Sequence, residues 1–234
     1  NYETNISDFQ LVSYILGRCA TVDEVKAEIA RVHIHGFDPR SSTVHWRFAE
    51  PSGRQIVLEI IDGKCVFYEN NLGVLTNSPS FDWQLTNLNN YVNLLPGRTE
   101  PHTLGNMSLS SFGGGSAMIG LPGDFTPPSR FVRAAFFQST APQKPDAEGS
   151  VFTAFHILGS MEIPIGAQFP VDETPADIPS ATQCTCVTDM SGLKFYYRSM
   201  YDGGIRCIDL KEIDFKKIGL KSEPLVPSKK EFVH

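Results

Sequence analysis

A polar turn near the middle of the chain, Asn77-Ser78-Pro79, is the first place where residue types suggest chemistry. It follows the apolar run Gly73–Thr76 and precedes a helical period that begins at Phe81. An amide at the end of a strand is well placed to donate a hydrogen bond to a substrate. The plainer alternative is that Asn77 only caps the following helix at Ser80.

The cationic candidates are Arg130 and Arg133, three residues apart at the start of an expected helix that Pro127 opens. This spacing places both side chains on roughly one helical face. Taken alone, Arg130 is better explained as a surface cation.

Three histidines, His33, His35 and His45, suggest a zinc site. No fourth ligand stands at a standard spacing and no cysteine is nearby, so structural roles are favoured for all three. The five cysteines are irregularly spaced, which is not the pattern of a disulfide framework. We therefore expect buried free thiols at Cys19, Cys65, Cys184, Cys186 and Cys207.

Helical and strand periods alternate along the first half of the chain. Ser7 is expected to cap a first helix, and Thr21 with Glu24 forms a capping box for a second. From Thr43 the apolar period changes to two, and Asp62-Gly63 is a hairpin signal. We expect a polar loop at residues 33–42 and an antiparallel meander with strands at 43–48, 56–61, 64–68 and 72–76.

In the second half, a helix after Asn77 is expected to bury Phe81, Leu85, Leu88 and Val92, with Gln84, Asn87 and Asn90 on its polar face. Residues 93–128 are a long loop rich in Gly, Ser and Pro, and such loops are usually functional or make a contact. Further helices are expected from Pro127 and over 150–158, and strands over 183–188, 193–200 and 205–210. Helices covering two sheets make an α+β layered fold.

The composition, 41% hydrophobic and 20% charged, is that of an ordinary folded protein. A net charge of -6 argues against a polyanionic partner such as nucleic acid. No apolar run approaches the roughly 20 residues of a membrane helix, so no membrane partner is expected. Asn1 opens the chain without a signal peptide or an initiating methionine, and a processed or truncated product is expected.

Four blocks of sequence carry a resemblance. They are Gly73–Pro79 continued by Phe81-Asp82-Trp83 and Asn87–Tyr91, then Gly120–Pro127 continued by Ser129–Arg133, then Phe155–Leu158, and finally Tyr196–Tyr201. Together they resemble the choloylglycine hydrolase family, which includes bile salt hydrolases and penicillin V acylases. The blocks occur in order across nearly the whole chain, which makes them more specific together than any one alone.

The resemblance implies an α+β N-terminal-nucleophile hydrolase, an αββα sandwich of two antiparallel sheets between helical layers. Residues 1–234 would be a single domain, the C-terminal portion of that fold. The family nucleophile is an N-terminal cysteine whose own α-amine is the base. Asn1 is not such a nucleophile, so we expect the cysteine outside this chain and the chain alone to be inactive.

Two catalytic residues carry over from the family. Asn77 is implied to donate to the oxyanion of the tetrahedral intermediate. Arg130 is implied to favour the thiolate of the cysteine, whereas Arg133 is expected to be a structural ion-pair partner. The reaction is hydrolysis of the amide of a glycine- or taurine-conjugated bile salt, with no metal or organic cofactor, and Phe37 is expected to bind the substrate.

The family also implies a homotetramer, with residues 93–126 as an assembly loop. The sequence leaves the compartment open between the bacterial cytoplasm and the periplasm. Two alternatives stay open. One is a penicillin V acylase or related acyl-amide hydrolase, and the other is a non-catalytic binding or assembly fragment.

Overall fold

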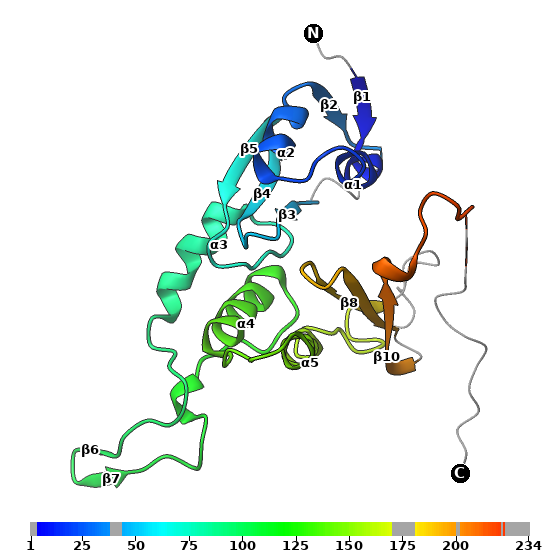
Figure 1. The fold of residues 1–234 in the computed structure, drawn as a ribbon. Helices are drawn as coiled ribbons and strands as arrows, with labels where there is room; N and C mark the ends of the chain where they lie inside the picture. The colour runs from blue at the N-terminus through cyan, green and yellow to red at the C-terminus, as the bar shows by residue number, and fades with distance from the viewer. Residues whose placement is uncertain (1–3, 38–43, 170–180, 200–201, 221, 223–234) are drawn as a thin grey trace. The chain divides into compact units, whose positions relative to one another are not determined.

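A computed structural model of the protein describes residues 4–37, 44–169, 181–199, 202–220 and 222. The chain divides into two compact units, Asn1–Thr140 and Ala141–His234, and Figure 1 shows their elements. All three candidate site residues belong to the first unit. Within the described ranges, no helix is long and apolar enough to cross a membrane. The single-domain organisation stays a prediction.

The first unit begins with two helices and a pair of parallel strands. Helix α1 (Asp8–Leu16) has Ser7 as its N-cap, and α2 (Val22–Ile29) is opened by the Thr21–Glu24 capping box, both as predicted. Strands β1 (Thr4–Ser7) and β2 (Val32–His35) pair in parallel and were not predicted. The expected loop at 33–42 is wrong at its start, because buried Val32 and Ile34 alternate with exposed histidines. Residues 38–43 of that loop lie outside the described residues.

A three-stranded antiparallel sheet forms the centre of the first unit, in the order β3-β4-β5. Its strands are β3 (Trp46–Ala49), β4 (Gln55–Ile61) and β5 (Lys64–Glu69). Ile56 and Leu58 of β4 are fully buried in a cluster with residues of α1 and α2. Val57, between them, is buried on the other face against Phe81 and Phe131. Strand β4 is therefore covered on both faces, and its Glu59 is buried at 3% exposure.

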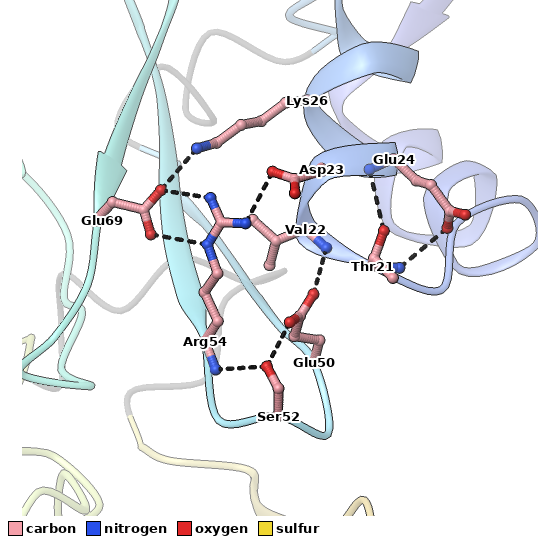
Figure 2. A network of polar contacts seen from close by, with 9 residues as sticks. All are labelled: Thr21, Val22, Asp23, Glu24, Lys26, Glu50, Ser52, Arg54 and Glu69. Carbon is pink, nitrogen blue, oxygen red and sulfur yellow. Dashed lines mark hydrogen bonds and ion pairs between the residues drawn. The ribbon is translucent and has the colours of Figure 1, made fainter.

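A polar network joins the start of α2 to this sheet, and Figure 2 shows its members as sticks. Glu69 of β5 accepts hydrogen bonds from Lys26 at 2.7 Å and from Arg54 at 2.9 and 3.2 Å. Arg54 also donates to Asp23 at 2.8 Å. The backbone N–H of Val22, in the first turn of α2, donates to the Glu50 carboxylate at 2.8 Å, which suits the positive end of the helix dipole.

The expected strand at 72–76 is wrong: this segment has no regular secondary structure and pairs with no strand among the described residues. Side chains satisfy its backbone instead. Asn70 accepts from the Gly73 N–H at 2.8 Å and donates to the Val74 carbonyl at 3.1 Å, while Arg47 donates to the Gly73 carbonyl at 3.1 Å. A backbone whose polar groups are paired in this way needs no neighbouring strand.

Helix α3 (Phe81–Asn87) follows and continues as the 3₁₀ turn η2 (Leu88–Tyr91). The buried face predicted for it is partly wrong. Phe81 is buried as expected, but Gln84 is buried too, at 2% exposure, whereas Val92 is 85% exposed. The interior stripe follows Phe81, Gln84 and Leu88, the i, i+3, i+7 positions, because the helix meets the sheet along that line.

The long loop at 93–126 contains a small hairpin, β6 (His102–Leu104) and β7 (Met107–Leu109), and the 3₁₀ turn η3 (Ser116–Met118). Helix α4 (Pro127–Thr140) then begins at Pro127 as predicted and closes the unit.

The second unit combines α5 (Ala147–Gly159) with an antiparallel sheet in the order β10-β9-β8. The strands are β8 (Cys184–Asp189), β9 (Lys194–Ser199) and β10 (Asp202–Asp209), followed by the 3₁₀ turn η4 (Leu210–Glu212). All three were predicted, and α5 packs against β8 in this unit (Figure 1). Arg198 of β9 pairs with Glu162 at 2.7 Å.

All five cysteines are free, as predicted, but they are not buried: Cys19 is half-buried and the other four are exposed. Strand alternation explains two of them. Thr185 donates to Glu162 and is buried, so Cys184 and Cys186 on either side of it point to the opposite face of the sheet.

Candidate active site

The two candidate catalytic residues are in direct contact. Arg130, in the first turn of α4, donates from Nη2 to Asn77 Oδ1 at 2.9 Å. Asn77 is exposed and Arg130 is half-buried. Arg130 is therefore not a free surface cation. Asn77 does not cap α3 either, because the N-cap of that helix is Ser80 and the donor to Asn77 Oδ1 is Arg130.

This contact defines the orientation of the Asn77 amide. A guanidinium has five N–H donors and no acceptor, so the amide end that faces it must be the oxygen. The Nδ2 end then points away from Arg130, and it has no hydrogen-bond partner within the described part of the chain. The site presents one exposed amide donor whose orientation is set by a cation.

The segment that carries Asn77 runs antiparallel to the helix that carries Arg130. Gln138, near the end of α4, donates to the Leu72 carbonyl at 3.0 Å, and Thr76 donates to the Pro127 carbonyl at its start at 3.1 Å. Gly73 allows this close approach: a Cβ at that position would lie 2.4 Å from Gln138 Nε2, and its φ of +74° is unfavourable for other residues.

Arg130 is itself held by the loop that precedes α4. Its Nε donates to the Phe125 carbonyl at 2.9 Å. Arg133, buried at 6% exposure, fixes that loop by donating to the carbonyls of Pro122 and Asp124 at 2.8 and 2.5 Å. Arg133 therefore bonds backbone carbonyls, and among the described residues it forms no ion pair with a carboxylate of the kind that was expected.

Asp124 completes the support of the Arg130 helix. Its carboxylate accepts from the Thr126 hydroxyl at 2.6 Å and the Ser129 hydroxyl at 2.7 Å. These hydrogen bonds lower the pKa of Asp124 to about 2, with the Thr126 hydroxyl as the first cause, so the carboxylate is charged at neutral pH.

A buried polar cluster lies under the Asn77 turn, and sequence reasoning did not assign it. Gln84 donates from Nε2 to the Asn77 main-chain carbonyl at 3.3 Å. His45 Nε2 lies 3.4 Å from the Ser78 hydroxyl, and its Nδ1 lies 2.7 Å from Glu59 Oε1 without good hydrogen-bond alignment. In the sequence, Gln84 and Glu59 looked like ordinary helix and strand residues, Ser78 was part of the polar turn, and His45 was considered only as a zinc ligand. Their meeting depends on tertiary packing, which no local pattern predicts.

Burial shifts both titrating members of this cluster toward their neutral forms. It raises the pKa of Glu59, which the Phe81 N–H partly offsets, and it lowers the pKa of His45. Burial likewise lowers the pKa of Arg130, with a smaller contribution from Arg133, but an arginine stays protonated at neutral pH. Arg130 is therefore the charged residue in contact with Asn77.

The remaining sequence candidates lie elsewhere. Phe37 follows β2, is 75% exposed, and makes an edge contact with Phe9 at 6.3 Å between ring centroids. No contact joins it to Asn77 or Arg130, and its binding of substrate stays a prediction. His33 and His35 stack on each other at 6.5 Å, and no group of three or more potential metal ligands occurs among the described residues.

A sequence profile of the linear amide C-N hydrolases of the choloylglycine hydrolase family matches residues 1–223. The chain belongs to this family. The bile salt hydrolase/transferase of Clostridium perfringens is 35% identical over 215 residues, which cover 90% of this chain and 64% of that protein. A family relative named penicillin V acylase, from Pectobacterium atrosepticum, is 30% identical over 228 residues, covering 88% of this chain and 53% of that protein.

Solved structures of the family show the same fold. A mutant conjugated bile acid hydrolase from Clostridium perfringens superposes with a TM-score of 0.82 at 31% identity, covering 99% of this chain and 71% of that one. The predicted fold class, α+β of the N-terminal-nucleophile hydrolases, is confirmed by this likeness. The chain spans 64% of the length of its Clostridium perfringens relative.

Proposed function

We propose that the protein hydrolyses the amide bond of bile salts conjugated to glycine or taurine. The observation that carries this proposal is the contact of Arg130 Nη2 with Asn77 Oδ1 at 2.9 Å in a chain of this family. It leaves the Asn77 Nδ2–H free to donate to an oxyanion, and the relative with 35% identity is a bile salt hydrolase/transferase.

The chemistry is nucleophilic acyl transfer. A cysteine thiolate attacks the amide carbon, and the carbonyl electrons move onto oxygen. Asn77 donates to that oxyanion, which stabilises it most when negative charge is fully developed. The intermediate collapses and expels the amine, which takes up a proton. Water then attacks the thioester, which releases the bile acid and regenerates the thiol.

The nucleophile of this mechanism is proposed to lie outside the 234 residues. The family nucleophile is an N-terminal cysteine, and the chain spans 64% of its bile salt hydrolase relative. The exposed cysteines Cys65, Cys184, Cys186 and Cys207 lie within or at the ends of strands, where no free α-amine is available as a base.

Penicillin V acylase is the second candidate, favoured by the 30% identity to the Pectobacterium enzyme of that name. The same oxyanion donor would serve it, because penicillin V also carries an acyl amide. A non-catalytic binding or assembly fragment is the third reading.

The full-length protein, meaning this chain together with the segment proposed to supply the nucleophile, is assayed on glycocholate, taurocholate and penicillin V. Release of glycine or taurine is expected, together with no turnover by the 234-residue chain alone. Turnover of penicillin V only would favour the second candidate. An active isolated chain would disprove the external nucleophile, and no turnover of any amide would support the non-catalytic reading.

Replacing the oxyanion donor tests the role of Asn77 directly. In the full-length protein, Asn77→Ala should lower kcat by about 10²–10³-fold with little change in KM, because the lost hydrogen bond forms in the transition state. Asn90→Ala, which removes an exposed amide from η2, is the matched control and should keep wild-type kcat. A wild-type kcat for Asn77→Ala would refute the assignment.

A further inference from the structure

Gln84 is a buried polar residue on the interior face of α3, where an apolar residue would pack without penalty. Its side chain is 2% exposed, and its Oε1 has no hydrogen-bond partner within the described residues. Burying an amide oxygen without a partner is unfavourable. The buried amide therefore contributes little to the stability of the fold. Its role is inferred from the one hydrogen bond that the side chain makes.

That hydrogen bond goes to the turn that carries Asn77. Gln84 Nε2 donates to the Asn77 main-chain carbonyl at 3.3 Å, and the Gln84 backbone N–H donates to the Ser80 carbonyl at 3.0 Å. The bond to Ser80 is the ordinary first-turn hydrogen bond of α3, so the side-chain bond to Asn77 is the contact that depends on Gln84 being a glutamine. Within the described chain, the Asn77 carbonyl has no other hydrogen-bond donor.

Glu59 fixes the helix on which Gln84 stands. It lies on β4, the central strand, is 3% exposed, and accepts from the Phe81 backbone N–H at 2.7 Å. The His45 ring lies between Glu59 and the Ser78 hydroxyl, at 2.7 and 3.4 Å. The turn therefore rests on groups anchored in the sheet.

We propose that Gln84 is a positioning residue for catalysis, which places the Asn77 backbone so that its amide reaches the oxyanion. This inference rests on the proposed function, because it assigns a task to the Asn77 donor. Arg130 fixes the rotation of the Asn77 side-chain amide. Gln84 fixes the position of the Asn77 main chain relative to the sheet. A donor displaced by about 1 Å can lose about 10²-fold in rate, so both supports matter.

The test replaces Gln84 by methionine in the full-length protein. Gln84→Met keeps the length of the side chain and removes both the Nε2 donor and the unpartnered oxygen. We expect kcat on glycocholate to fall by about 10–10²-fold with KM nearly unchanged. The melting temperature should not fall, because a buried unpartnered polar atom is removed.

A double-mutant cycle separates positioning from general packing. If Gln84 acts through Asn77, Gln84→Met should change kcat by less than about twofold in an Asn77→Ala background. Thr86→Ala, on the exposed side of the same helix, is the control and should leave kcat at the wild-type value. Should Gln84→Met fail to fold, Gln84→Asn keeps an amide but withdraws it by one methylene from the Asn77 carbonyl, and the same loss is expected.

Each result has one interpretation. A wild-type kcat for Gln84→Met, beside a large loss for Asn77→Ala, overturns the inference and leaves the proposed function intact. An equal loss for Gln84→Met in both backgrounds assigns Gln84 to packing and also overturns it. A wild-type kcat for Asn77→Ala refutes the oxyanion assignment itself, and the inference falls with it.

Discussion

The side chain of Asn77 has an oxygen and a nitrogen end of nearly equal size, and only the nitrogen can stabilise an oxyanion. Arg130 resolves this ambiguity because it can only donate. The geometry therefore supports a second role for Arg130 besides the favouring of a thiolate that the resemblance implies. One guanidinium edge holds Asn77 Oδ1 and its Nε holds the Phe125 carbonyl, so the group bridges two fixed oxygens.

The substitution Arg130→Lys distinguishes two roles of Arg130, the orientation of the Asn77 amide and the supply of a positive charge. Arg130→Lys keeps the positive charge but replaces the planar fork by a single ammonium, which does not reproduce the bridge between Phe125 and Asn77. If orientation of Asn77 is the main task, kcat of Arg130→Lys should fall by about 10–10²-fold, close to the loss in Arg130→Met. Both are measured as kcat on glycocholate in the full-length protein.

Retention of most activity by Arg130→Lys, with a large loss in Arg130→Met, would instead assign Arg130 to thiolate stabilisation by charge. The acidic limb of the kcat/KM profile should then shift upward in Arg130→Met, because a cysteine without its neighbouring cation has a higher pKa.

At the scale of elements, the sequence correctly predicted the helix starts and the hairpin turn, which depend on signals from neighbouring residues. Ser7 and the Thr21–Glu24 capping box mark the starts of α1 and α2 correctly, and the Asp62-Gly63 turn joins β4 to β5, with φ of +49° and +73°. These features depend on residues a few positions apart. The resemblance supplied Asn77 and Arg130, and the structure adds their contact.

The errors fall where distant side chains decide the outcome. Asn70 and Arg47 satisfy the backbone of 72–76, so an apolar run that looks like a strand has no strand partner within the described ranges. The helical period was compatible with burying either Gln84 or Leu85, and the apolar Leu85 was chosen, which assigned Gln84 to the polar face. Packing against the sheet decides which of the two side chains is buried, and it is Gln84. Both errors lie next to the Asn77 turn. Functional sites are where the periodic patterns of apolar and polar residues are expected to fail as predictors of structure.

The network of Figure 2 predicts a pH dependence of stability. Hydrogen bonds from Arg54 and then Lys26 lower the pKa of Glu69 from 4.5 to about 2. A carboxylate with a lowered folded-state pKa stabilises the fold above its unfolded pKa, and this contribution disappears as the pH falls toward the folded value. Glu69→Gln should therefore lower the melting temperature slightly near neutral pH. This difference should shrink as the pH falls below 4.5 and be largely lost by about pH 2, where about half of wild-type Glu69 is protonated.

The comparison is made by thermal unfolding of the full-length protein followed by circular dichroism. Glu100→Gln is the matched control, since Glu100 is exposed and makes no ion pair within the described part of the chain. A melting-temperature difference for Glu69→Gln that persists unchanged at low pH would contradict the assignment. The difference should also shrink with added salt, because the network is exposed.

At the scale of the whole molecule, the long loop at 93–126 closes on itself. The Leu95 N–H donates to the Ala117 carbonyl at 3.1 Å, and the Gly115 N–H donates to the Gly97 carbonyl at 2.7 Å. The hairpin beyond these hydrogen bonds exposes Leu104 and Met107 at 69% and 64%. These two residues lie opposite each other in the β6–β7 register, so they share one face. Exposed apolar side chains gathered on a projecting loop are typical of a contact surface.

We predict that this loop assembles the protein into its oligomer. Deleting residues 96–118, or the shorter stretch 98–114 bridged by a glycine linker, should lower the mass found by sedimentation. The shorter deletion should leave the melting temperature of the resulting protomer unchanged once concentration is held low, because Gly97 and Gly115 already meet.

A double substitution, Leu104→Ser with Met107→Ser, should lower the sedimentation mass without shortening the chain. Thr103→Ala with Ser108→Ala changes the neighbouring cross-strand pair of the same hairpin and should not lower the mass. An unchanged mass for the deletion would exclude the assembly role. A mass lowered by the deletion but not by the double serine variant would place the contact in the backbone or the polar residues of the loop instead of its apolar face.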